Sequence, residues 1–257
     1  MTTLVHYGIE GGVARLTLDS PDTHNALSTA MVDQLRRGFD AAAAASGVRA
    51  VVLGHTGKTF CAGADLTEAA GRDPGDVAVN RARAMTQVLR AILELPIPVI
   101  AAIDGHVRAG GLGLVGACDV AIAGSASTFA LTEARIGVAP SIISLTLLPK
   151  MTARAAGRYF VTGEKFGAEE AARIGLISVA AADVAATVAA LTEEITKGSP
   201  QGLATSKALT TAAILDGFDC HAEALTEQSA RLFVSDEARE GMLAFLEKRP
   251  PQWNQLT

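Results

Sequence analysis

The sequence contains few cysteines, few aromatic residues and no excess of basic residues. Cys61, Cys118 and Cys220 are too few and too scattered among 257 residues for a disulfide framework, which indicates a reducing, cytoplasmic setting. The formal net charge is −5 and aromatic residues make up 4% of the chain. The sequence therefore contains no basic, aromatic-rich patch of the kind that would indicate a nucleic-acid partner.

Long apolar runs are absent as well. No run reaches the roughly 20 residues that a membrane-spanning helix needs, so we expect no membrane partner. Residues 1–12 lack the charged-then-apolar layout of a secretion signal. The five histidines are scattered along the chain, and we expect no metal site.

What the chain does contain is a regular alternation of short apolar runs with segments of helical periodicity. Met31, Leu35 and Phe39 are spaced four apart and follow Ser28, a typical N-cap residue, which predicts one helix. The alternation predicts an α/β core with a parallel sheet up to about residue 180 and mainly helices from about residue 183. We place the boundary between a core at 1–195 and a helical extension at 196–257. The predicted strands are 13–19, 49–55, 98–105 and 118–124.

Gly111, Gly113 and Gly116 have the spacing G-x-G-x-x-G, which is the fingerprint of dinucleotide-binding proteins. That fingerprint requires the first glycine at the end of a strand and an acid at the end of the next strand. Here residues 106–109 separate the predicted strand from the glycines, and Glu133 lies well beyond the next predicted strand. Dinucleotide binding therefore fits poorly.

A different use of these glycines fits the pattern better. Glycines at a junction between strand and helix let a ligand approach the free N–H groups of the helix start. The loop FCAGADL at 60–66 also follows a predicted buried strand and also contains small residues. Two such loops facing one carbonyl group would form an oxyanion hole for an enolate or a tetrahedral adduct.

Several segments together resemble the crotonase superfamily, the enoyl-CoA hydratase and isomerase group. They are HNALS, KTFCAGADL, AAIDGHVRAGGLGLVGACDVAIAG, TFALTEARIGVAP, EEAARIGLI and EGMLAFLEKRPPQW, beginning at residues 24, 58, 101, 128, 169 and 240. The resemblance implies a crotonase-like (ClpP/crotonase) α/β spiral of ββα units with a helical C-terminal region for trimerisation. It also implies a homotrimer or a dimer of trimers.

The resemblance further implies that the backbone N–H groups of Ala62 and Gly110 bind the thioester oxygen of an acyl-CoA, while Glu133 transfers the proton. The family's second catalytic glutamate falls on Gly113, so the chain is identified as a single-glutamate member. Coenzyme A is part of the substrate, and no separate cofactor is expected. The expected substrate-binding residues are His24, Ala26, Lys58, Ala64, Asp65, Leu66, Arg108, Gly113, Phe245 and Lys248, with Phe245 and Lys248 reaching a neighbouring subunit.

The activity implied is hydration of a 2-enoyl-CoA, in fatty-acid and lipid metabolism. Two alternatives stay open: a double-bond isomerase that uses one glutamate, and a non-catalytic acyl-CoA-binding homologue. We interpret the missing side chain at Gly113 as extra room beside the substrate, and the alternative is that a water molecule or another side chain fills the gap. Because Arg108 lies in the same loop, a branched or glutaconyl-type acyl group is expected.

Overall fold

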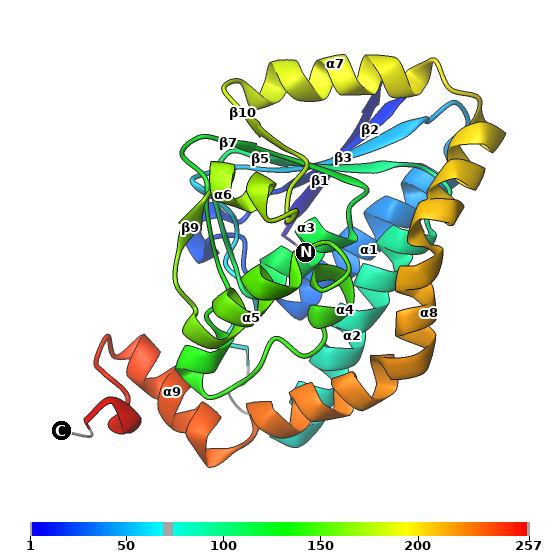
Figure 1. Ribbon diagram of the computed structural model, residues 1–257. Coiled ribbons are helices and arrows are strands. Elements are labelled where there is room, and N and C mark those ends of the chain that lie inside the picture. Colours follow the sequence, from blue (N-terminus) through cyan, green and yellow to red (C-terminus); the bar gives the residue numbers. More distant parts are fainter. Residues whose placement is uncertain (1, 69–73, 256–257) are drawn as a thin grey trace.

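A six-stranded sheet forms one layer of the computed structural model, which describes residues 2–68 and 74–255 (Figure 1). The strand order is β1-β2-β3-β5-β7-β10; β1 pairs antiparallel with β2, and the other pairs are parallel. The four predicted strands are confirmed, whereas β1 and β10 were not predicted. The bounds are β1 Val5–Glu10, β2 Val13–Leu18, β3 Ala50–His55, β5 Val99–Ile103, β7 Val120–Gly124 and β10 Val179–Ala181.

A smaller sheet of short strands lies beside the first, in the order β4-β6-β8-β9. Strands β4, β6 and β8 follow β3, β5 and β7 in the chain and pair parallel with one another. This repetition of two strands and a helix is the expected spiral of ββα units. The bounds are β4 Thr59–Cys61, β6 His106–Arg108, β8 Thr128–Ala130 and β9 Phe166–Gly167, with β9 antiparallel to β8.

Helices cover both faces of the large sheet (Figure 1). Helix α1 (Thr29–Ala44) begins at the predicted N-cap, where the Ser28 hydroxyl accepts a hydrogen bond of 3.1 Å from the Met31 N–H. Val188 of α7 packs over Val13 and Ile100 on the outer face of the sheet. The other helices are α2 Pro74–Glu94, α3 Gly110–Ala117, α4 Ser144–Leu147, α5 Ala153–Thr162, α6 Ala168–Arg173, α7 Val184–Thr196, α8 Pro200–Phe233 and α9 Asp236–Leu246.

The C-terminal part is helical, as predicted. Its long helix α8 runs beside α2 (Figure 1). Buried Lys207 of α8 forms an ion pair of 2.8 Å with Asp119 and donates 2.7 Å to the carbonyl of Ile92, near the end of α2. A cation at a helix C-terminus satisfies carbonyl groups that lack intrahelical partners. The boundary predicted at 195/196 lies at the end of α7. Among the described helices, none combines the length and apolar character needed to cross a membrane.

Candidate active site

The active-site candidates gather at one edge of the small sheet. Because β4, β6 and β8 are parallel, the segments that follow them emerge at the same edge. These segments are the loop at 62–66, the junction of Ala109 with Gly110, and the short 3-10 helix η2 (Glu133–Ile136). All three border a cavity of about 950 Å³, which has the size of a site for a small-molecule ligand.

In the loop after β4, the backbone amide that faces the cavity is that of Ala64. The Ala62 N–H donates to the carbonyl of His24 at 3.1 Å and is therefore already used. On the same loop, Leu27 pairs with the neighbours of Ala64: the Leu27 N–H donates to Gly63 at 2.7 Å and the Asp65 N–H donates to Leu27 at 3.4 Å. Since N–H groups alternate in direction along an extended chain, the Ala64 N–H points away from Leu27 and has no partner among the described residues.

This arrangement corrects the assignment of Ala62 as an oxyanion donor. Ala62 does line the cavity, but its N–H group holds the early loop in place. Ala64, expected only as a substrate contact, lines the cavity with a free N–H group. The sequence could not separate the two, because both are small residues on either side of Gly63.

The second free amide is that of Gly110, the first residue of α3. Within residues 2–68 and 74–255 its N–H group has no hydrogen-bond partner, as is usual for the first turn of a helix. Ala109 precedes it with a φ of 46° and a ψ of −123°, a sparsely populated conformation that costs a non-glycine residue about 1–3 kcal/mol. Gly63, with a φ of 93°, approaches so closely that a Cβ atom there would lie 3.4 Å from the Gly110 nitrogen. The two loops with free amides therefore lie against each other.

The glycines of α3 serve packing. A Cβ atom on Gly111 would lie 2.8 Å from Cys61, and one on Gly113 would lie 2.4 Å from Cγ2 of Ile143. Gly113 is buried, and it is not among the residues that line the cavity. The expectation of extra room beside the substrate at Gly113 is therefore wrong, because Ile143 already occupies that space. Because Gly113 does not line the cavity, its expected role in binding substrate is contradicted as well.

Glu133 is a buried carboxyl group at the cavity wall, with an exposed fraction of 7%. Its Oε2 atom has no hydrogen-bond partner in the described part of the chain. Burial in apolar surroundings disfavours the charged form and raises the pKa of Glu133 to about 7. A carboxyl group with this pKa exchanges protons readily near neutral pH, which suits a general acid or base.

The profile of the family described as "Enoyl-CoA hydratase/isomerase" matches residues 8–256. The chain belongs to the enoyl-CoA hydratase/isomerase family. An enoyl-CoA hydratase from Mycobacterium avium is 63% identical with a TM-score of 0.92, over 98% of this chain and 100% of that one. Another from Mycobacterium smegmatis is 34% identical with a TM-score of 0.79, over 99% and 100%. A Rhodobacter capsulatus protein named "Probable enoyl-CoA hydratase" is 35% identical over 253 residues, or 97% of each chain.

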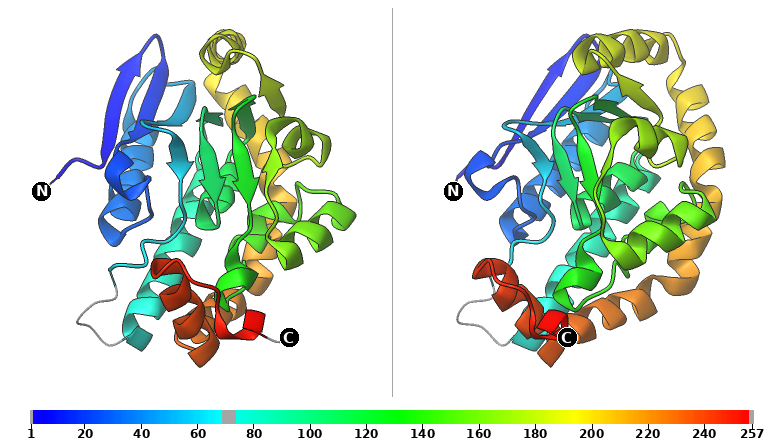
Figure 2. Two further views of the ribbon diagram at one scale, coloured as in Figure 1. Left: turned by 90° about the vertical axis from the view of Figure 1, so that its left-hand side faces the viewer. Right: turned by 60° about the vertical axis from the view of Figure 1, so that its left-hand side comes forward.

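These similarities confirm the family and the crotonase-like α/β fold that the sequence predicted. In this member of the enoyl-CoA hydratase/isomerase family, η2 is held from two sides. Helix α9 packs against it, with Gly241 and Gly137 at the closest approach of the two backbones. Residues of α9 and of the segment that follows it thus line one side of the cavity. Figure 2 shows the course of this C-terminal segment in two further views.

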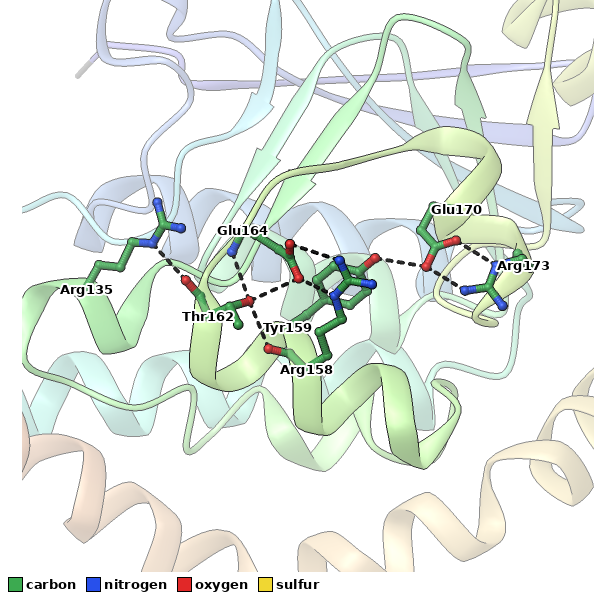
Figure 3. A network of polar contacts seen from close by, with 7 residues as sticks. All are labelled: Arg135, Arg158, Tyr159, Thr162, Glu164, Glu170 and Arg173. Carbon is green, nitrogen blue, oxygen red and sulfur yellow. Dashed lines mark hydrogen bonds and ion pairs between the residues drawn. The ribbon is translucent and has the colours of Figure 1, made fainter.

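On the other side of η2 lies a network of polar side chains from α5 and α6 (Figure 3). The Nε of Arg135 donates 2.9 Å to the carbonyl of Thr162, at the end of α5. The Thr162 hydroxyl in turn donates 2.9 Å to the carbonyl of Arg158, which pairs with Glu164. Exposed ion pairs contribute little energy singly, but this network fixes the segment that carries Glu133.

Arg108 lines the cavity, yet its guanidinium group is not free. Nη1 donates 2.8 Å to the Val107 carbonyl and 2.7 Å to the Thr128 carbonyl, and Nη2 donates 2.8 Å to the Thr128 hydroxyl. Lys165 and Arg81 also border the cavity. In the part of the chain that the structure describes, none of the three basic groups forms an ion pair with a carboxylate.

Sequence reasoning missed several polar residues of the cavity wall, among them Arg81 and Lys165, and it assigned no role in the site to Ser141. Arg81 of α2 donates to the carbonyl of Asp65 and lies over the ring of Phe233 at 5.8 Å. It lies one helical turn before Met85, and a cation at helical spacing from an apolar residue was a usable signal. Nothing in the pattern around Ser141 marks its buried hydroxyl.

The remaining expected substrate contacts fall into two groups. Leu66 and Phe245 line the cavity with Ala64, and Phe245 does so within its own chain, although it was expected to reach a neighbouring subunit. The structure does not bring the others to the cavity wall: they are His24, Ala26, Lys58, Asp65 and Lys248. Of these, Asp65 uses its carboxylate to accept hydrogen bonds from Thr67, at 2.9 Å and 2.7 Å.

Proposed function

We propose that the protein is an enoyl-CoA hydratase that adds water across the double bond of a 2-enoyl-CoA thioester. The observation that carries the proposal is that a buried, unpartnered carboxyl oxygen of Glu133 shares a cavity with the unpartnered N–H groups of Ala64 and Gly110. One group moves protons and the other two stabilise negative charge on a carbonyl oxygen. These are the two requirements of chemistry at the α-carbon of a thioester.

The proposed reaction follows from this geometry. The thioester oxygen lies between the two N–H groups, and the Glu133 carboxylate takes a proton from a water molecule. The water oxygen bonds to the β-carbon, the π electrons move toward the thioester oxygen, and an enolate forms. Glu133 then gives its proton to the α-carbon as the carbonyl reforms, so that one water molecule has been added. Removing one oxyanion donor in other enzymes costs about 10²–10³ in rate.

Recognition of coenzyme A is supported by charge. Arg81 and Lys165 line the cavity and form no ion pair within the described part of the chain, and phosphate groups are suitable partners for such cations. We propose that the phosphates of the acyl-CoA meet these side chains and that no separate cofactor takes part.

We also propose a homotrimer or a dimer of trimers. Its support is that α9 presents apolar side chains to solvent in the single chain, with Phe245 64% and Leu246 54% exposed. Light scattering of the purified protein tests this part, since a monomeric mass contradicts it.

The proposal of a branched or glutaconyl-type acyl group now depends on Arg108 alone, because Ile143 fills the space at Gly113. The Arg108 guanidinium borders the cavity and lacks a carboxylate partner, which favours an acidic acyl group. Its three hydrogen bonds to Val107 and Thr128 already use part of its donor capacity. The comparison of glutaconyl-CoA with crotonyl-CoA as substrates decides this point.

The test of the proposed function is a panel of enoyl-CoA thioesters with two readouts. A hydratase removes the absorbance of the conjugated thioester and adds the mass of one water molecule. The alternative isomerase with a single glutamate creates that absorbance from a 3-enoyl-CoA without a change in mass. Saturable binding with neither product identifies a non-catalytic acyl-CoA-binding protein and overturns the proposal.

A further inference from the structure

Two buried side-chain oxygens in the described part of the chain lack a hydrogen-bond partner: Oε2 of Glu133 and Oγ of Ser141. Both residues line the same cavity, and their exposed fractions are 7% and 6%. Buried polar atoms are almost always paired, and a buried unpaired hydroxyl lowers stability. Two such exceptions on one cavity wall indicate partners that belong to the bound state.

The surroundings of Ser141 show why its hydroxyl is left over. The Ser141 N–H donates 2.8 Å to the carbonyl of Ala139, and the Ser141 carbonyl accepts a hydrogen bond from the hydroxyl of Ser144. The backbone on both sides of the Cα atom is therefore satisfied, and the hydroxyl of Ser144 is already used. Buried Pro140 precedes Ser141 and restricts the chain at that point.

We propose that the Ser141 hydroxyl holds the attacking water molecule together with Glu133. This inference rests on the proposed hydratase function and names the group that positions its water. The water donates one hydrogen to the Glu133 carboxylate and the other to Oγ of Ser141, which leaves a lone pair of its oxygen for the β-carbon. Ser141 keeps its own proton throughout, so the balance of the reaction is unchanged.

The need for such a group follows from position 113, where the resemblance places the second glutamate of the family and this chain has a glycine. Gly113 has no side chain, and apolar Ile143 occupies the space beside it. Held by Glu133 alone, a water molecule would be free to rotate about a single hydrogen bond. A second hydrogen bond fixes the direction of the attacking lone pair, and an error of about 1 Å in such positioning can cost about 10²-fold in rate.

The experiment compares two reactions of the same enzyme, of which only one uses the attacking water. Hydration of crotonyl-CoA requires both Glu133 and the positioned water. Exchange of the α-protons of butyryl-CoA with D₂O requires Glu133 and the oxyanion donors, but adds no water. For Ser141→Ala we expect the kcat of hydration to fall about 10²-fold, with KM and the rate of α-proton exchange within about threefold of the parent enzyme.

Ser144→Ala is the matched control, because it removes a hydroxyl from the same turn, at a residue that does not line the cavity. It should retain hydration within about threefold. Equal losses of hydration and exchange in Ser141→Ala would show a structural role and overturn the inference, and so would unchanged hydration. If the parent enzyme exchanges α-protons but hydrates no enoyl-CoA, the proposed function itself fails, which is a separate outcome.

Discussion

Cγ2 of Ile143 occupies the position that a side chain at Gly113 would need, since a Cβ atom there would lie only 2.4 Å away. Met85 closes the same space from α2, with its Cε 3.2 Å from that position. The backbone of helix α3 at Gly113 therefore packs directly against the Ile143 side chain, in the segment that precedes α4. Any side chain at position 113 must displace Ile143, whatever its chemistry.

We expect Gly113→Ala to lower the free energy of unfolding by about 1–3 kcal/mol, because overpacking forces neighbouring atoms to move. Combining it with Ile143→Ala should cost less than the sum of the two single changes, by at least about 0.5 kcal/mol. Chemical denaturation of the four proteins measures this coupling. Gly157→Ala on α5 is the control, since open space surrounds Gly157. Strict additivity of the double variant would contradict the packing argument.

The choice between two neighbouring amides gives the second prediction. Proline has no backbone N–H group, so Ala64→Pro should reduce kcat about 10²–10³-fold through loss of an oxyanion donor. Ala62→Pro removes the hydrogen bond to His24 instead. It should lower the melting temperature, and it should reduce kcat less than Ala64→Pro does. Steady-state kinetics and thermal unfolding of both variants separate the roles. A greater loss of kcat for Ala62→Pro, with both variants folded, would return the role to Ala62.

The larger sheet was mostly predictable from the sequence, because its central strands are continuous apolar runs between helical segments. The short strands β4, β6 and β8 have three residues each, too few to show a period. Strand β1 carried a usable signal that was missed: Gly11 and Gly12 both have positive φ, which is typical of a two-residue hairpin turn.

At the site, the sequence identified the loops but could not show which groups in them were free. Whether the N–H of Ala62 or of Ala64 faces the cavity depends on bonds from His24 and Leu27, which lie far away in the chain. The space at Gly113 depends on Ile143, thirty positions later. Close packing between distant segments decides such questions, and residue types within one loop do not.

Arg81 gives the third prediction. We expect Arg81→Met to raise KM for an acyl-CoA about tenfold, which corresponds to about 1.4 kcal/mol. The change removes a cation from the cavity wall and its hydrogen bond to the Asp65 carbonyl. The KM of the variant should also depend less on salt concentration than that of the parent enzyme.

Arg83→Met is the matched control, because Arg83 lies on the same helix but pairs with Glu223 at 3.5 Å and does not line the cavity. Its KM should equal that of the parent enzyme. Equal increases of KM in the two variants would show a general effect of removing a positive charge from α2. They would contradict a contact between Arg81 and coenzyme A.

The last prediction concerns the buried carboxyl of Glu133, first as a catalytic group. Its pKa is raised to about 7 by burial, and only the carboxylate can accept a proton from water. We therefore expect kcat/KM for hydration to rise with pH up to about 7 and to level off above it. Glu133→Gln should reduce kcat by at least about 10² at every pH while leaving acyl-CoA affinity nearly intact. A flat pH profile would contradict the role as base.

The same pKa predicts a dependence of stability on pH. The unfolded chain releases this proton near the ordinary value of 4.5 and the folded chain near 7, so the folded state holds more protons between those values. The free energy of unfolding should therefore fall as pH rises from about 4.5 to about 7, by about 3 kcal/mol from this group. Glu133→Gln lacks the titrating group, so its stability relative to the parent should increase over that range. Urea denaturation from about pH 5 to about pH 8 measures the difference, and a constant difference would show that the carboxyl is not held in an apolar site.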